Sequence, residues 1–345
     1  MSASHSRDPI VLAATQSSTE ANLEDGPQDG MSTPPMAYSI FSKNHKRWMI
    51  CLVAFAGWFS TLSSFIYFPA ITTLAESLET SVTKINLTVT SYLVVAALAP
   101  SITGDVADKS GRRPVVIATL GIYVVANIGL ALQRSYPALL VLRMIQSAGI
   151  SGVFAIAYGV VADIASPAER GGFVGIVSFG TNTAPALGPL LGGVLLAFRG
   201  WTSIFWFLGI SAGVCLCLAI FTLPETARNI VGNGSISVSG IYTLPFFMNR
   251  TTLQRTEREK KFNWRLPNPL TCLYRLSDKD TSILIITLSI FYMTYTCLQA
   301  TLSTIFIGLY GLSDLQAGLI YLPFGIGCAI AALGTGIAII LDKHL

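Results

Sequence analysis

A short charged stretch, GDVADKSGRRP, interrupts a chain that is otherwise mostly apolar; it runs from Gly104 to Pro114. Its available chemistry is ion pairing, because Asp108 stands where a helix is expected to end and Arg112 where the next begins. The helix dipole disfavours both placements. We therefore expect Asp108 and an arginine to form ion pairs with charged groups of other helices and so lock the helices together. The alternative is a solvated turn in which Gly111 takes a positive φ and Pro114 opens the next helix.

A second feature is Arg143, which stands inside a long segment of otherwise uncharged residues, 137–162. It lies about six residues from the start of that segment, which is roughly 9 Å along a helix at about 1.5 Å per residue. If the segment crosses a membrane, a central arginine costs roughly 2.5–3.5 kcal/mol on insertion scales, so it marks a functional site by default. The alternative is a side chain that extends outward from that depth to the polar interface.

The composition indicates that a membrane surrounds these residues. Hydrophobic residues make up 52% of the 345 residues, charged residues make up 12%, and the mean hydropathy is +0.61. Soluble domains carry about 25% charged residues, and about 20 apolar residues cross a bilayer as a helix. We therefore predict an all-α integral membrane protein with eight spans, at residues 48–70, 85–103, 114–133, 137–162, 172–198, 201–223, 281–304 and 315–341.

The distribution of Lys and Arg predicts the orientation of these spans. We number the links between spans from the N-terminus. The tail before the first span, the second, fourth and sixth links and the residues after the last span together carry 18 Lys and Arg residues. The other side carries Lys84, Arg134 and Arg199. Basic residues mark the cytoplasmic side of a membrane. The sequence therefore predicts cytoplasmic termini; we expect a protein of the plasma membrane, with the vacuolar membrane as the open alternative.

The spacing of the spans divides the chain into four parts. Residues 1–47 form a polar tail that we expect to be disordered and cytosolic, and residues 48–223 hold six closely spaced spans. Residues 224–280 form a long cytosolic link, and residues 281–345 hold two further spans. Two parallel six-span halves are a common architecture of secondary transporters. On that pattern, the chain has one six-helix half and the first two helices of the other.

The stretch LGPLLGG in the fifth predicted span predicts close helix packing. Gly188 and Gly192 are four residues apart, so they lie on one face of a helix and allow a neighbour to approach closely. Between them, Pro189 removes a backbone hydrogen bond and is expected to kink the helix. Gly193 ends the stretch.

The charged stretch resembles the cytosolic signature of the major facilitator superfamily. That signature is a Gly, three residues, an Asp, a cation, one residue, a Gly and two cations, and it is matched in full by Gly104, Asp108, Lys109, Gly111, Arg112 and Arg113. The resemblance implies that Arg112 pairs with Asp163, at the end of the fourth span, in a latch that holds the outward-open state. It also implies that Asp108 faces a helix of the second half.

Other motifs resemble fungal drug:proton antiporters of this superfamily, of the quinidine-resistance and dityrosine-exporter type. LGPLLGG is similar to their antiporter signature, with Ala184 where the pattern has a Gly. Arg143 and Gln146 fit a pattern that the resemblance links to proton coupling. PETARNIVGNGS after the sixth span and LSDLQAGLIYLPFGIG at the eighth are also similar. The resemblance covers residues 48–345, and it implies a transporter truncated after the eighth span.

The predicted spans contain no Asp or Glu, so the sequence does not reveal a route for protons. All three His lie in tails, and no set of nucleophile, base and orienting group is recognisable, so we predict neither an enzyme nor a metal or other cofactor. Side chains that could line a substrate cavity are Asn127, Gln146, Tyr158, Asn182, Tyr295 and Gln299. For each of them, a hydrogen bond between helices is the favoured alternative.

The resemblance predicts a proton-coupled transporter that exports small organic molecules, such as drugs, toxins, polyamines or secondary metabolites, by alternating access. Its partners would be that substrate, protons and the lipid bilayer, and no nucleic acid. The particular substrate and the oligomeric state stay open. The alternative is a non-transporting truncated membrane protein that acts as a sensor or as a partner of a full-length transporter.

Overall fold

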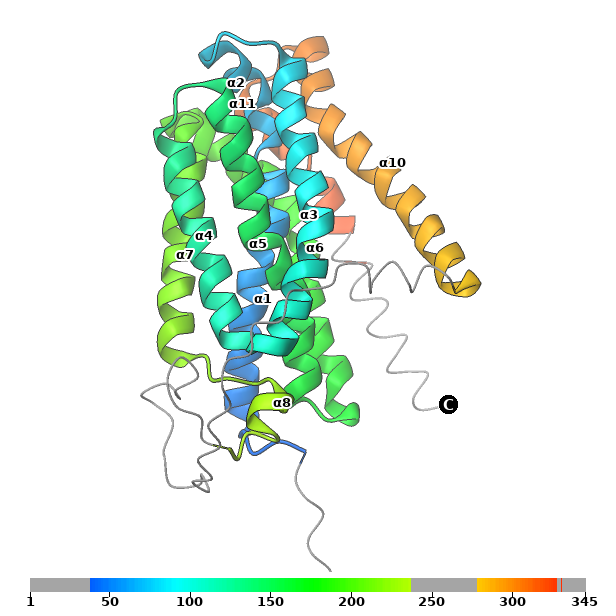
Figure 1. Cartoon of the computed structure of the whole chain (residues 1–345). Helices are drawn as coiled ribbons and strands as arrows, with labels where there is room; N and C mark the ends of the chain where they lie inside the picture. Colours follow the sequence, from blue (N-terminus) through cyan, green and yellow to red (C-terminus); the bar gives the residue numbers. More distant parts are fainter. Residues whose placement is uncertain (1–37, 237–277, 328–329, 331–345) are drawn as a thin grey trace, which may run out of the picture. The chain divides into compact units, whose positions relative to one another are not determined.

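The computed structural model describes residues 38–236, 278–327 and 330, and the regular elements in these ranges are helices (Figure 1). Their bounds are α1 Lys43–Phe65, η1 Phe68–Ala70, α2 Ile71–Ser77, α3 Val82–Ser110, α4 Arg112–Leu132, α5 Tyr136–Ile164, α6 Pro167–Arg199, α7 Thr202–Thr222, α8 Arg228–Val231, α10 Lys279–Tyr310 and α11 Asp314–Leu319.

Seven helical stretches of the described residues are long and apolar enough to cross a membrane. They contain α1 with η1 and α2, then α3 to α7, and α10, and they match the first seven predicted spans. The eighth predicted span, 315–341, begins with α11, and most of the rest lies outside the described residues. The prediction of an all-α integral membrane protein is therefore confirmed.

The charged stretch lies on helices rather than in a polar link, which corrects the predicted boundaries. The second predicted span stops at residue 103, but α3 continues to Ser110. An ion pair between Lys109 and Asp105, one turn apart, supports this extension. Gly111 breaks the helix with a φ of 102°, as predicted for a residue without a side chain. Since α4 begins directly afterwards, Pro114 is its third residue and not its first.

The first helix also begins earlier than predicted, at Lys43 instead of residue 48. The side chain of Ser42 accepts a hydrogen bond from the His45 backbone N–H at 3.4 Å, and such a cap stabilises a polar first turn. The predicted tail therefore loses residues 43–47 to α1, and residues 1–37 lie outside the described part. In the predicted link, α8 forms near the start, while residues 237–277 lie outside the described part.

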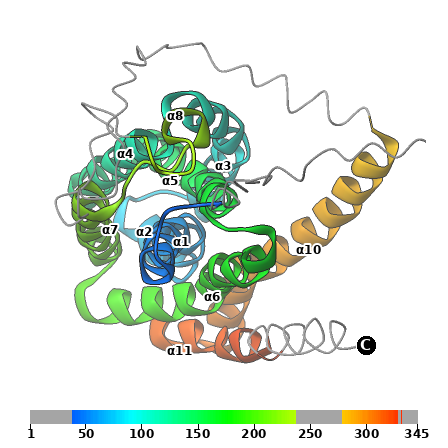
Figure 2. The same ribbon diagram turned by 90° about the horizontal axis from the view of Figure 1, so that it is seen from below.

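Helix α5 packs against α1, α3 and α4, and α1 also packs against α6 (Figure 2). Small residues allow these close contacts. A Cβ atom at Gly152 would lie 1.8 Å from Oγ1 of Thr103 on α3, and one at Gly149 would lie 2.8 Å from the backbone nitrogen of Tyr123 on α4. The polar signature at the end of α3 and the start of α4 is thus held beside the end of α5.

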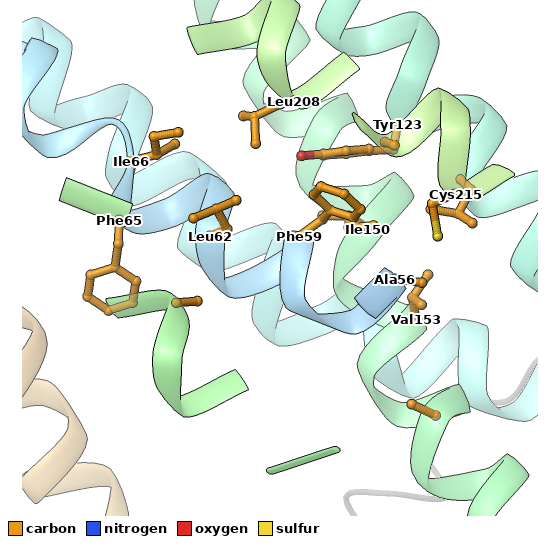
Figure 3. Packing of buried hydrophobic residues seen from close by; sticks show 14 of the residues in the cluster. Ala56, Phe59, Leu62, Phe65, Ile66, Tyr123, Ile150, Val153, Leu208 and Cys215 are labelled. Atoms are coloured by element: carbon orange, nitrogen blue, oxygen red, sulfur yellow. The ribbon is translucent and has the colours of Figure 1, made fainter. Parts of the chain in front are cut away.

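The apolar core joins α1, α4, α5 and α7 (Figure 3). Phe59, Tyr123, Ile150 and Leu208 are fully buried, and the rings of Phe59 and Tyr123 lie 6.1 Å apart. Apolar side chains also cover the outside of the bundle, where Val125 is 69% exposed. A helical protein that is apolar on both its inner and outer faces fits a hydrocarbon environment.

The LGPLLGG stretch of α6 packs closely against two other helices, which confirms the packing prediction. A Cβ at Gly188 would lie 2.9 Å from the Phe65 Cβ, and a Cβ at Gly192 would lie 2.2 Å from the Ile66 carbonyl oxygen. On the α11 side, a Cβ at Gly318 would lie 2.7 Å from the Pro189 carbonyl oxygen and 3.4 Å from the Gly193 Cα. The LGPLLGG stretch therefore contacts both the end of α1 and the last turn of α11.

We expect Gly192→Ala to destabilise the protein, because its methyl group would collide with the Ile66 carbonyl and force the helices apart. Overpacking of this kind costs about 1–3 kcal/mol. The matched control is Gly175→Ala on the same helix, where a Cβ meets nothing within 4 Å and alanine favours the helix by up to ~1 kcal/mol. Thermal unfolding in detergent compares the two; equal melting temperatures would contradict the packing argument.

Candidate functional site

The charged signature forms an ion-pair cluster where α3 ends and α4 begins. We call this end of the bundle the basic end, because Arg112, Arg113, Arg170 and Arg228 gather there. The Arg112 Nε atom lies 3.1 Å from Oδ2 of Asp163, and its Nη2 atom forms an ion pair with Asp108. The Arg112 and Asp163 side chains are only 12% and 13% exposed. We call the pair of Arg112 and Asp163 the latch.

A missing side chain on α5 makes room for the latch. A Cβ atom at Gly159 would lie 2.6 Å from the Arg112 Cζ atom, so the guanidinium passes over this glycine to reach Asp163 one turn later. Asp108 does not share this burial, since its side chain is 62% exposed. Its ion-pair partner among the described residues is Arg112, and a partner on a helix of the second half stays a prediction.

The remaining signature residues have separate contacts. Lys109 pairs with Asp105 along α3, and the Arg113 Nη2 atom donates to the Ile220 carbonyl of α7 at 2.7 Å. A Cβ atom at Gly104 would meet nothing within 4 Å. Contacts of the signature residues therefore join α3, α4, α5 and α7 at the basic end. Arg112 is the signature arginine that forms the latch.

A buried carboxylate, Glu225, holds the start of α4. Its Oε1 atom accepts hydrogen bonds from the backbone N–H groups of Arg112, Thr226 and Ala227 at 2.8, 2.9 and 2.9 Å, and its Oε2 atom accepts one from Arg113 at 3.2 Å. Helix N-termini attract negative charge, so this position suits a carboxylate. Burial raises the pKa of the Glu225 carboxyl, and the four backbone N–H groups oppose that rise.

We expect Glu225→Ala to destabilise the basic end, because four backbone N–H groups lose their acceptor at a side chain that is 1% exposed. Buried unsatisfied donors cost about 1–3 kcal/mol. The control is Glu76→Ala at an exposed site on α2, where changes usually stay within about 0.5 kcal/mol. Thermal unfolding measures both variants. If the two variants lose equally little thermal stability, Glu225 does not stabilise the start of α4.

Arg143 is fully buried, which overturns the alternative that its side chain extends outward to the interface. Its Nη1 atom donates to the Ser63 carbonyl at 3.2 Å and to Oε1 of Gln146 at 2.7 Å. The rings of Tyr67 and Tyr92 lie 4.3 and 4.4 Å from its Cζ atom. Nε and Nη2 have no hydrogen-bond partner in the described part of the chain. This cation is therefore held by aromatic rings and neutral oxygens.

A hydrogen-bonded network continues from Arg143 to α4. Gln146 donates through Nε2 to Oδ1 of Asn127 at 2.7 Å, and Asn127 donates to the Tyr123 carbonyl at 2.8 Å. Gln146 and Asn127 thus form a hydrogen bond between helices, the alternative that the sequence favoured. Both are buried inside the six-helix bundle.

A cavity of about 350 Å³ lies between α1 with η1, α3 and α10, and none of the predicted cavity residues lines it. Its lining includes Ser64, Asn86, Thr90 and Thr296, and the described lining residues include no Asp, Glu, Lys, Arg or His. That the predicted residues line a substrate cavity therefore stays a prediction. Polar side chains in an apolar helix turn either to a cavity or to each other.

The other predicted cavity residues are placed in different surroundings. Tyr158 shares a hydrogen bond with Ser178 at 3.2 Å, and Asn182 is exposed on α6. The Tyr295 ring packs 6.1 Å from that of Phe65, and it contacts Gln299 through a hydrogen bond of 3.4 Å. Tyr295 therefore connects α10 to the end of α1, while its hydrogen bond with Gln299 lies within α10.

Sequence reasoning missed several contacts at the basic end. Lys46 pairs with Glu169 at 2.9 Å and so joins α1 to α6. Glu225 and Arg228 both lie in PETARN, which the family resemblance singled out without assigning a contact. The available signal for Glu225 was its position directly after an apolar span. A helix that starts at the same end of the bundle has backbone N–H groups without a partner in its first turn, and a carboxylate can accept hydrogen bonds from them.

The bundle and its latch define a multi-span α-helical membrane protein. The sequence profile of the Major Facilitator Superfamily matches residues 53–343, and the chain belongs to this family.

The chain is similar to Citrate exporter 1 of Aspergillus niger, at 37% identity over 93% of this chain and 62% of that protein. It is also similar to the multidrug transporter QDR2 of Candida glabrata, at 38% identity over 89% of this chain and 54% of the relative. The chain thus spans about half to two thirds of the length of these curated relatives. A solved bacterial homolog of the human lysosomal transporter Spinster shares the fold, with a TM-score of 0.62 at 16% identity over 88% of this chain and 64% of that one.

Proposed function

We propose that the chain acts in the export of small organic molecules across the plasma membrane in exchange for protons. The observation that carries this proposal is the similarity, along 89–93% of the chain, to proteins named as a citrate exporter and a multidrug transporter. Both termini would be cytoplasmic, because the basic end then faces the cytoplasm. Neither relative is named as a sensor or as an inactive partner, so the non-transporting alternative is not favoured.

Three features support a transport mechanism. The latch joins α4 to α5 at the basic end, the uncharged cavity provides room for an organic molecule, and Arg143 places a buried positive charge inside the six-helix bundle. In the proposed cycle, the latch stabilises the outward-open state and releases when the basic end opens. Arg143 provides the charge that responds to proton movement, since its Nε and Nη2 atoms can donate hydrogen bonds to a new partner.

Reconstitution in liposomes tests this proposal. Liposomes that contain the purified chain are loaded with citrate or with quinidine, an organic cation, and release is measured with and without a pH gradient. We expect release of at least one compound to depend on the gradient and to stop when a protonophore is added. A folded chain that releases neither compound would contradict the proposal and favour the non-transporting alternative.

A further inference from the structure

The residues just before α1 contact two distant parts of the chain at the basic end. The Tyr38 hydroxyl donates to the Ala162 carbonyl at 3.0 Å and accepts a hydrogen bond from Nη2 of Arg170 at 3.2 Å. Two residues later, the Ile40 backbone N–H donates to the Asn233 carbonyl at 3.1 Å. This short segment is therefore docked on the end of α5, on the start of α6 and on the residues after α8.

Arg228, the first residue of α8, joins this segment to α5. Its guanidinium carbon lies 3.6 Å from the centre of the Tyr38 ring, and its Nη2 atom donates to the Tyr38 carbonyl at 3.0 Å. Its Nε atom donates to the backbone carbonyl of Asp163 at 2.8 Å. Figure 1 shows α8 at the same end as the start of α1. We call Tyr38 and Arg228, with the carbonyls of Ala162 and Asp163, the clasp.

The clasp supplies what the end of α5 needs. The last carbonyl groups of an α-helix have no partner within the helix, and positive charge stabilises a helix C-terminus. Ala162 and Asp163 lie in the last turn of α5, and their carbonyls accept from Tyr38 and Arg228. The Asp163 carboxylate is unfavourable at a helix C-terminus, so its orientation toward Arg112 depends on how firmly this turn is held.

We propose that Tyr38 and Arg228 are positioning residues for the latch, so that docking of the segment before α1 sets how readily Arg112 and Asp163 separate. This inference rests on the proposed function, because it treats the latch as the part that opens during transport. The geometry favours such control. Arg170 and Arg228 are exposed and Tyr38 is half-buried, so the clasp can release without unpacking the apolar core. The chain before the first span and the chain after the sixth then act on one ion pair.

Double-mutant cycles test the proposal through thermal unfolding, which needs no transport. Tyr38→Phe removes the hydroxyl and keeps the ring beside Arg228, and Arg228→Gln removes the guanidinium. We expect each change to lower the melting temperature by about 2 °C or more, with the loss at least halved when Arg112→Gln has already broken the latch. In a Lys109→Gln background, which breaks the separate pair with Asp105, the loss should be unchanged.

The controls are Tyr310→Phe, at a tyrosine that is 65% exposed, and Arg47→Gln, at an exposed arginine of α1; both should melt like the parent. Losses that are the same in the Arg112→Gln background would overturn the proposal, as would a Tyr38→Phe variant that melts like the parent. Should Arg228→Gln fail to fold, Arg228→Lys keeps the charge and removes the branched donors, and it enters the same cycle.

A transport measurement adds a second, independent readout. If the parent chain exports a probe, Tyr38→Phe should lower kcat several-fold with KM within about twofold, because the change affects the opening step and not the cavity. A raised KM with unchanged kcat would contradict a positioning role. If the parent exports nothing, the proposed function fails, while the unfolding cycles still decide whether the clasp positions the latch.

Discussion

Arg143→Met is expected to abolish export while changing the stability of the folded protein by no more than about 2 kcal/mol. The side chain is fully buried, and in the described part of the chain no carboxylate forms an ion pair with it. Removing a buried charge recovers its desolvation penalty, which offsets the hydrogen bond lost at Gln146. Methionine also fills most of the space between the Tyr67 and Tyr92 rings. A costly charge that stability does not require is best explained by function.

Two measurements check this prediction: gradient-dependent release from liposomes and thermal unfolding in detergent. We expect release to fall by at least a hundredfold in Arg143→Met, with a melting temperature near that of the parent. The control is Arg134→Met, at an exposed arginine before α5, which should retain both properties. A variant that still transports would contradict a coupling role for Arg143. One that fails to fold would show that the guanidinium is a structural requirement.

Neutralising one partner of the latch is expected to be more harmful than neutralising both. Arg112 and Asp163 are 12% and 13% exposed, so Arg112→Gln leaves the mostly buried Asp163 carboxylate without its ion pair, and Asp163→Asn leaves Arg112 with only the exposed Asp108 as its ion-pair partner. Breaking a buried pair in this way costs about 3–5 kcal/mol, and replacing both charges avoids much of that cost. We expect export to fall at least tenfold in either single variant, because the closed form of the basic end is lost.

The matched control for the latch is Lys109→Gln, which breaks an ion pair of the same signature between side chains that are 36% and 30% exposed. Exposed pairs contribute about 0–1 kcal/mol, so this variant should melt and transport like the parent. Melting curves of both single variants and of the double variant complete the comparison. Additive losses in the double variant would contradict direct pairing of Arg112 with Asp163.

Much of the fold could be predicted from the sequence, because lipid requires long apolar helices. The seven described spans, the positive φ of Gly111 and the close packing at Gly188 and Gly192 all follow from local residue types. The pairing of Arg112 with Asp163 was implied by the resemblance to the major facilitator superfamily, and the structure contains it. Boundaries were less accurate, because polar residues at helix ends can stay helical when capped or ion-paired.

Other parts of the site depended on the tertiary structure. Depth along a span did not determine whether Arg143 points inward or outward, because neighbouring helices decide which side is polar. Two rings keep the Arg143 side chain inside the bundle. They belong to Tyr67, between α1 and η1, and to Tyr92 on α3. The sequence also did not determine which polar residues line a cavity. Asn127 and Gln146, for example, form a hydrogen bond with each other.

The sequence by itself therefore determined the spans, the small-residue face of Gly188 and Gly192 and the charged signature, all of which depend on residues close together in the chain. Only the tertiary structure decided how Glu225 supports the start of α4 and how Tyr38 and Arg228 hold the end of α5. The physical reason is separation along the chain: these hydrogen bonds join residues that lie close together only after the helices have packed.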